Sequence, residues 1–138
     1  DALNGYQKGK CFYCYRPIEI SSGALNLAEV DHLFAHALQR VGLLSNLDGV
    51  WNLVLACAEC NRGSQGKFDA TPVTKYVARL HSRNEYLIAS HHPLRETLIL
   101  QTGGTEDRRR SFLQSTLDVA RVHQVAVWEA SPQGDESF

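Results

Sequence analysis

Apolar residues in the second half of this chain recur every three or four positions, which is typical of amphipathic helices. From 71 to 124 this pattern is interrupted at His91-His92-Pro93 and at Gly103-Gly104. It predicts three helices: Thr71 to about Ser90, Leu94 to Gly103, and Thr105 to His123. Thr71 and Pro72 fit the start of the first helix, as a cap residue and a first-turn proline.

Apolar runs in the first half are shorter and indicate strands. Residues 53–56 read L-V-L-A between polar neighbours, which is typical of a short buried strand leading into a turn. Upstream, apolar residues lead into Asp31-His32. Between the two, the pattern from Phe34 to Leu44 predicts a short helix or helical loop, followed by a loop from Ser45 to Gly49.

All four cysteines fall in two C-x-x-C pairs, Cys11/Cys14 and Cys57/Cys60. Two such pairs separated by a long insert indicate a tetrahedral zinc site made of four cysteines. Two disulfides or four buried thiols are the alternatives. Nothing marks the chain as secreted, and C-x-x-C loops are strained as structural disulfides, so zinc explains the pattern best.

Composition restricts the class of protein. The formal net charge of -1 excludes a uniformly basic nucleic-acid binder. No apolar run approaches the ~20 residues that a membrane span needs, and no signal peptide is visible. Reduced cysteines suit the cytoplasm. We expect a single domain at 1–130 and a disordered tail at 131–138. Because the chain starts at Asp1 and lacks methionine, we interpret it as a piece of a longer polypeptide or a processed one.

Polar residues between and after the cysteine pairs carry a family resemblance. Residues 28–36 read A-E-V-D-H-L-F-A-H, and 51–67 read W-N-L-V-L-A-C-A-E-C-N-R-G-S-Q-G-K. This order resembles the HNH endonucleases. Their site has an Asp-His pair, then an Asn, and then an Asn or His after the hairpin, and two C-x-x-C knuckles often bracket the hairpin. The matched residues are Asp31, His32, Asn52 and Asn61. The run 61–63 also resembles the metal-binding turn of HNH domains in RNA-guided CRISPR nucleases.

The resemblance covers about half the chain and implies its fold class. That class is α+β, with a ββα-metal hairpin-and-helix core at about 9–67, bracketed by two zinc knuckles, and a helical extension at about 71–124. Val30–His32 would pair antiparallel with Asn52–Leu55, and a short helix after Cys57 would carry Asn61 at its start. Adjacent strand residues point to opposite faces, so we expect an irregularity where Asp31 and His32 reach one site.

The implied activity is metal-dependent hydrolysis of phosphodiester bonds in DNA. By this resemblance, His32 would be the general base, and Asn52 would hold the hairpin so that His32 stays oriented. Asp31 and Asn61 would bind one Mg²⁺ or Mn²⁺ as oxygen ligands.

Three more residues are predicted to contact substrate, namely Arg62, Lys67 and His36. Taken singly, each polar residue here is a common turn or cap former, and only their joint order and spacing favour a site.

Two alternatives stay open. A non-catalytic zinc-knuckle module that binds nucleic acid or protein would keep the four cysteines without needing Asp31, His32 or Asn61. A ribonuclease of the same fold would use the same residues on RNA. Other domains or subunits of a larger protein, such as an antiphage or restriction system, are expected as partners on analogy alone.

Overall fold

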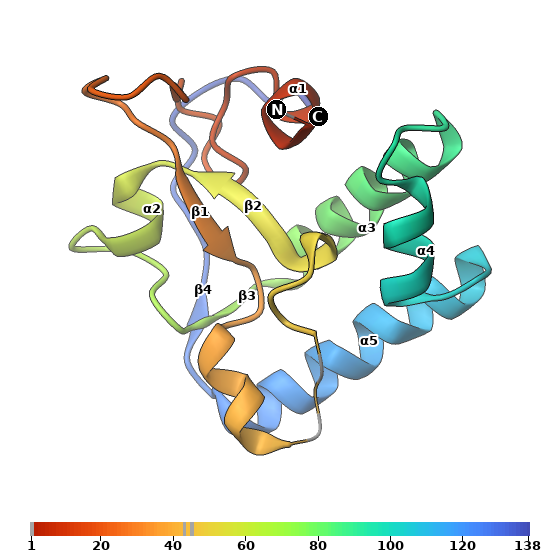
Figure 1. Ribbon diagram of the computed structural model, residues 1–138. Coiled ribbons are helices and arrows are strands. Elements are labelled where there is room, and N and C mark those ends of the chain that lie inside the picture. Colours follow the sequence, from red (N-terminus) through yellow and green to blue (C-terminus); the bar gives the residue numbers. More distant parts are fainter. Residues whose placement is uncertain (1, 43, 45) are drawn as a thin grey trace.

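Strands β1 (Glu29–His32) and β2 (Leu53–Ala56) form an antiparallel pair in the computed structural model (Figure 1). Four residue pairs, from Glu29 with Ala56 to His32 with Leu53, follow one another without a bulge. Helix α2 (Ala58–Arg62) comes directly after β2. The predicted strand pairing is therefore confirmed, although Asn52 belongs to the 3-10 turn η2 (Val50–Asn52) that precedes β2.

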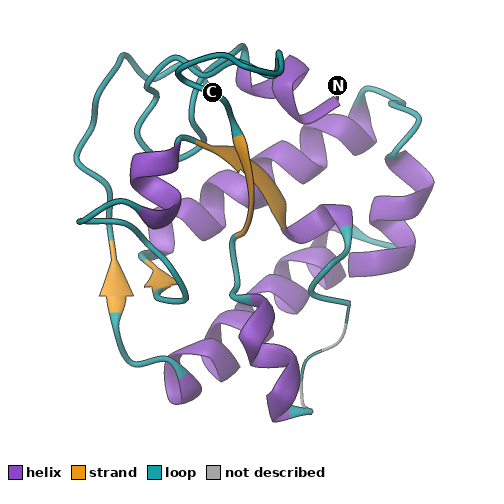
Figure 2. Cartoon of the chain, turned by 60° about the vertical axis from the view of Figure 1, so that its left-hand side comes forward, coloured by secondary structure: helices purple, strands orange, loops and turns teal. Residues whose placement is uncertain are grey.

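The structure describes residues 2–42, 44 and 46–138. Leu43 and Ser45, which fall in the predicted helical segment and the following loop, lie outside the described residues. Next to them, η1 (His36–Val41) is a 3-10 helix, in agreement with the predicted helical loop. The mixture of helices and short strands confirms the α+β class (Figure 2).

Helix α1 (Ala2–Gln7) covers the free edge of β2 through one buried side chain. The Gln7 amide donates to the backbone oxygen of Leu55 at 2.8 Å and accepts from the Leu55 nitrogen at 3.0 Å. The Phe12 nitrogen donates to the same oxygen at 3.0 Å. These bonds replace a third strand, so the backbone groups at this edge are paired.

Three helices fill the second half: α3 (Thr74–Ala89), α4 (Arg95–Thr102) and α5 (Glu106–His123). They confirm the predicted helical extension. The helices are interrupted at the predicted positions, His91-His92-Pro93 and Gly103-Gly104. Thr105 caps α5, since its hydroxyl accepts from the Arg108 nitrogen at 3.2 Å. Of the helices in the described part of the chain, none is long and apolar enough to cross a membrane.

The predicted start of the first long helix is wrong. Thr71–Pro72 is a strand, β3, that pairs in parallel with β4 (Val127–Trp128), and the helix begins at Thr74. The Thr71 nitrogen donates to the Ala126 oxygen at 2.9 Å and the Val73 nitrogen to the Trp128 oxygen at 3.0 Å. The ladder uses the N–H groups on either side of Pro72, so the missing proline N–H costs nothing.

The prediction of a disordered tail at 131–138 is also wrong. The Gln133 nitrogen donates to the Cys14 oxygen at 2.8 Å, and the Tyr15 hydroxyl donates to the Phe138 oxygen at 2.9 Å. The ring of Phe138 lies 4.9 Å from that of Tyr15. The segment is polar in composition, but its final aromatic residue supplies the apolar contact that orders it over the first cysteine pair.

Candidate metal centre and active site

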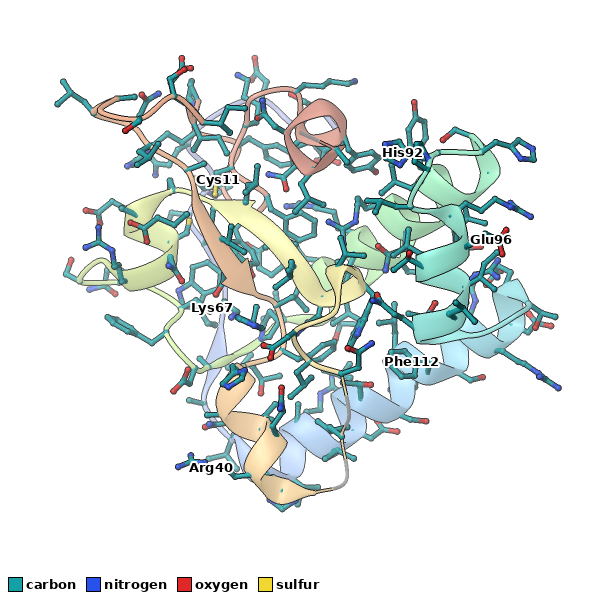
Figure 3. All side chains as sticks on the ribbon, in the orientation of Figure 1. Cys11, Arg40, Lys67, His92, Glu96 and Phe112 are labelled. Atoms are coloured by element: carbon teal, nitrogen blue, oxygen red, sulfur yellow. The ribbon has the colours of Figure 1, made fainter. Side chains whose placement is uncertain are left out.

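The four cysteines lie together in one buried cluster, at the end of β2 where Figure 3 labels Cys11. Their sulfurs all lie within 4.8 Å of one another, with those of Cys14 and Cys57 3.7 Å apart, and all four are free thiols. Sulfurs bound to a tetrahedral zinc at ~2.3 Å are ~3.8 Å apart. The cluster therefore has the ligands and dimensions to hold a metal ion such as Zn²⁺.

Backbone amides surround these sulfurs as donors. Four N–H groups point at them with nitrogen–sulfur distances of 3.3 to 3.4 Å. Within the cluster, hydrogen bonding led by Cys11 lowers the pKa of Cys14 to about 7, whereas the neighbouring thiols, Cys11 first, raise the pKa of Cys60. Only the thiolate binds a metal ion, so amide donors that stabilise it favour metal binding.

Asp31 faces the interior from β1. Its Oδ2 accepts a hydrogen bond from the Tyr13 hydroxyl at 2.5 Å and lies 3.2 Å from the Lys67 ammonium. Lys67 also donates to the backbone oxygen of His32 at 2.8 Å. Burial lowers the pKa of Lys67, and Asp31 opposes that shift.

Lys67 corrects one expectation. Its side chain is 0% exposed and lies near the end of β1, so in this structure it does not reach a substrate as predicted (Figure 3). Its role is instead to hold Asp31 and the last residue of the strand.

Asn61 lies in the last turn of α2 and not at its start. Its amide donates to the Glu29 carboxylate at 2.8 Å, and Arg62 makes two further bonds to Glu29 at 2.9 and 3.0 Å. These contacts, Arg62 first, lower the pKa of Glu29. Glu29 is a site residue that sequence reasoning missed, although its position two residues before Asp31 puts both on one face of β1.

The predicted ion between Asp31 and Asn61 stays a prediction. No hydrogen bond joins the two side chains, and each has other partners. In both, however, Oδ1 accepts no hydrogen bond from any residue that the structure describes. Two such oxygens are suitable ligands for a hard divalent cation.

His32 faces away from Asp31, toward the loop before η2. His32 Nε2 and His36 Nδ1 each lie 2.8 Å from Asp48 Oδ1, and the two rings are 5.4 Å apart. The irregularity expected at this point is absent, because β1 pairs regularly up to His32. Alternation along the strand therefore separates the two neighbours.

Asn52 joins the two segments that carry the histidines and Asp48. It is fully buried; its side-chain oxygen accepts from the Phe34 nitrogen at 2.8 Å, and its amide donates to the oxygens of Phe34 and Leu47 at 2.9 and 2.8 Å. Phe34 follows His32, and Leu47 precedes Asp48. Asn52 thus joins the two segments through their backbone groups and makes no hydrogen bond to the His32 ring.

Scans against protein-family models, curated proteins and solved structures found no match to this chain. Asp48, which the sequence pattern gave no reason to select, orients His32 through Nε2 and leaves Nδ1 without a hydrogen-bond partner among the described residues. Hydrogen bonds with His32 and then with His36 lower the pKa of Asp48. A partly exposed imidazole held by a carboxylate is suited to accept a proton from water.

Proposed function

We propose that this chain is a metal-dependent endonuclease of the HNH type that hydrolyses phosphodiester bonds of DNA. The observation that carries the proposal is the His32–Asp48 contact of 2.8 Å, at the end of the β1–β2 pair that α2 follows. The family resemblance of Asp31, His32, Asn52 and Asn61 adds to it. The four-cysteine cluster supports a frame held by zinc.

His32 acts as the general base in this proposal. Asp48 engages Nε2, so Nδ1 takes a proton from the water that attacks phosphorus, and the bond to the 3′ oxygen breaks. The nearby carboxylate stabilises the imidazolium that forms. Asn52 is a positioning residue, because its bonds to Phe34 and Leu47 keep His32 and Asp48 in place. By family resemblance, the products carry a 5′-phosphate and a 3′-hydroxyl.

Asp31 and Asn61 would hold the Mg²⁺ or Mn²⁺ through their unbonded oxygens. Such an ion supplies charge neutralisation at the phosphate and at the leaving oxygen. Asp31 would then contact both this ion and the Lys67 ammonium. Arg62 is exposed at 65% of its side chain and would contact the backbone of the substrate after leaving Glu29. His36 would lie beside the substrate.

Plasmid cleavage by zinc-loaded protein tests the proposal. Wild type should cut DNA only with added Mg²⁺ or Mn²⁺, and His32→Ala should lower the rate by ~10²-fold or more while divalent ions still bind. His123→Ala is the matched control, because it removes an exposed histidine at the end of α5 and should leave the rate unchanged.

Two outcomes would contradict the proposal. Full activity of His32→Ala would remove the assigned base. Absence of cleavage of DNA and RNA by folded wild type would favour the second candidate, a zinc module that binds nucleic acid or protein, which the four-cysteine cluster by itself also fits. Cleavage of RNA alone would change the substrate and keep the mechanism.

A further inference from the structure

His32, His36 and Asp48 form a second group of metal-ligating side chains in the described part of the chain, apart from the cysteines. Their ligand atoms lie within 4.8 Å of one another, and the three side chains are 30%, 59% and 62% exposed. We propose that these three residues bind a transition-metal ion, Zn²⁺ above all, at a site separate from the four-cysteine cluster, and that this ion inhibits the nuclease.

The ligand set selects the kind of metal. Two imidazole nitrogens and one carboxylate oxygen suit Zn²⁺ or Ni²⁺, whereas Mg²⁺ and Mn²⁺ prefer oxygen ligands. Neighbouring ligands on a tetrahedral zinc lie ~3.4 Å apart for bonds of 2.0–2.2 Å. Both nitrogens now lie 2.8 Å from Asp48 Oδ1, so small side-chain rotations make room for an ion. Three protein ligands leave a position open to water.

The backbone already holds the three ligands near one another. His32 is the last paired residue of β1, and His36 is the first residue of η1. The Asp48 loop is fixed by Asn52, which bonds the Leu47 oxygen, and by the Gly49 nitrogen, which donates to the Asn46 oxygen at 2.9 Å. Little ordering is then needed on binding, and preorganised ligands bind more tightly.

Inhibition follows from the chemistry of imidazole, and this part rests on the proposed function. A neutral imidazole that gives one ring nitrogen to a metal carries its proton on the other. An ion on Nε2 of His32 therefore keeps the proton on Nδ1, the nitrogen that would accept one from water. The base is blocked while the ion is bound.

Equilibrium dialysis against Zn²⁺, without nucleic acid, tests the binding. Wild type should take up about two zinc ions per chain, one in the cysteine cluster and one here. His36→Ala and Asp48→Asn should each weaken the second site by at least ~10–100-fold, a loss already seen when groups that only support ligands are removed. His123→Ala should keep both. About one zinc per wild-type chain at every concentration would overturn the site.

Cleavage assays in Mg²⁺ with added Zn²⁺ test the inhibition, each variant being compared with its own rate without added zinc. The zinc concentration that halves the rate should rise by ~10-fold or more in His36→Ala. An unchanged concentration would mean that zinc acts elsewhere and would overturn the inhibition. Should wild type cut nothing, the proposed function fails, while the dialysis result still decides the metal site.

Discussion

Asp31 and Lys67 form a buried ion pair with Tyr13 as a third member. The Asp31 oxygen that lies 3.2 Å from the ammonium also accepts from the Tyr13 hydroxyl. Burial, and then Asp31, raise the pKa of Tyr13 well above its usual value, so the phenol stays a donor. Taking both charges out of water offsets most of their attraction, but an unpaired charge left inside is costly.

Lys67→Met should therefore destabilise the protein by ~3–5 kcal/mol, because it leaves Asp31 buried without a cation. Adding Asp31→Asn should recover much of that loss. Urea unfolding at neutral pH measures both. Lys75→Met is the control: its ammonium pairs with Glu129 at the exposed surface, where a salt bridge contributes ~0–1 kcal/mol. A double variant no more stable than Lys67→Met would show that the two residues are not coupled.

The candidate site shows what a sequence can say about single residues. Order and spacing selected Asp31, His32, Asn52 and the cysteines, because these positions have residue types that the chemistry requires. Their partners come from distant segments: Asp48 lies 16 positions from His32, and Lys67 reaches back 35 positions to the His32 oxygen. No periodicity marks such pairs, since tertiary folding brings them together.

Helix α2 depends on its ends. Five residues are too few for a helix that is stable alone. Its N-cap is Cys57, whose sulfur accepts from the Cys60 nitrogen at 3.4 Å, and Glu29 holds the last turn. One residue is thus both a candidate zinc ligand and the cap of the helix.

Removing the metal should therefore unfold α2 and the strands beside it. Structural zinc contributes ~10–16 kcal/mol at neutral pH, as much as the whole stability of a typical domain. Purified protein should contain about one tightly held zinc per chain, and chelation under reducing conditions should abolish its cooperative thermal transition. Circular dichroism melts with metal analysis measure this.

Thr105→Ala serves as the comparison, because it removes a helix cap that no metal supports. It should cost ~1 kcal/mol and leave the zinc content unchanged. An unaltered melt after the zinc is shown to be gone would contradict the structural role of the metal.

Local patterns predicted α3, α4 and α5 well and β3 badly, for one physical reason. Helix hydrogen bonds join residues four positions apart, so periodicity and breakers in the sequence mark helices directly. Strand β3 depends on a partner at Val127–Trp128, far along the chain. Thr71-Pro72 has the local signature of a helix start, and only the distant ladder decides otherwise.

At the scale of the whole molecule, Arg83 on α3 connects the helices to the strand half. Its guanidinium donates to the oxygens of Leu53, Val50 and Trp51 at 2.8, 3.1 and 3.2 Å. Burial lowers its pKa to about 10, so it stays charged at neutral pH. These carbonyls surround Asn52, so the helical half supports the segment that positions the candidate site.

Arg83→Met should remove these three bonds and leave the Leu53 oxygen unpaired, at a cost of ~1–3 kcal/mol, and should lower cleavage by loosening η2. The Val50 and Trp51 oxygens keep bonds from the Leu53 nitrogen and the Asn84 amide. Denaturant unfolding followed by the fluorescence of buried Trp51 measures the stability. Arg108→Met, on the exposed side of α5, should stay within ~0.5 kcal/mol of wild type. Equal losses in the two variants would rule out a connecting role for Arg83.

The ordered tail has a consequence for the way the chain is made. Phe138 covers Tyr15 from 123 positions later in the sequence. At ~5–20 residues per second, a ribosome takes ~6–25 s to bridge that gap. During this interval the ring of Tyr15 lacks its contact with Phe138 and is open to chaperones. Cys57 and Cys60 are made well before Phe138, so the cysteine cluster can take up a metal ion before the segment 131–138 covers the first pair.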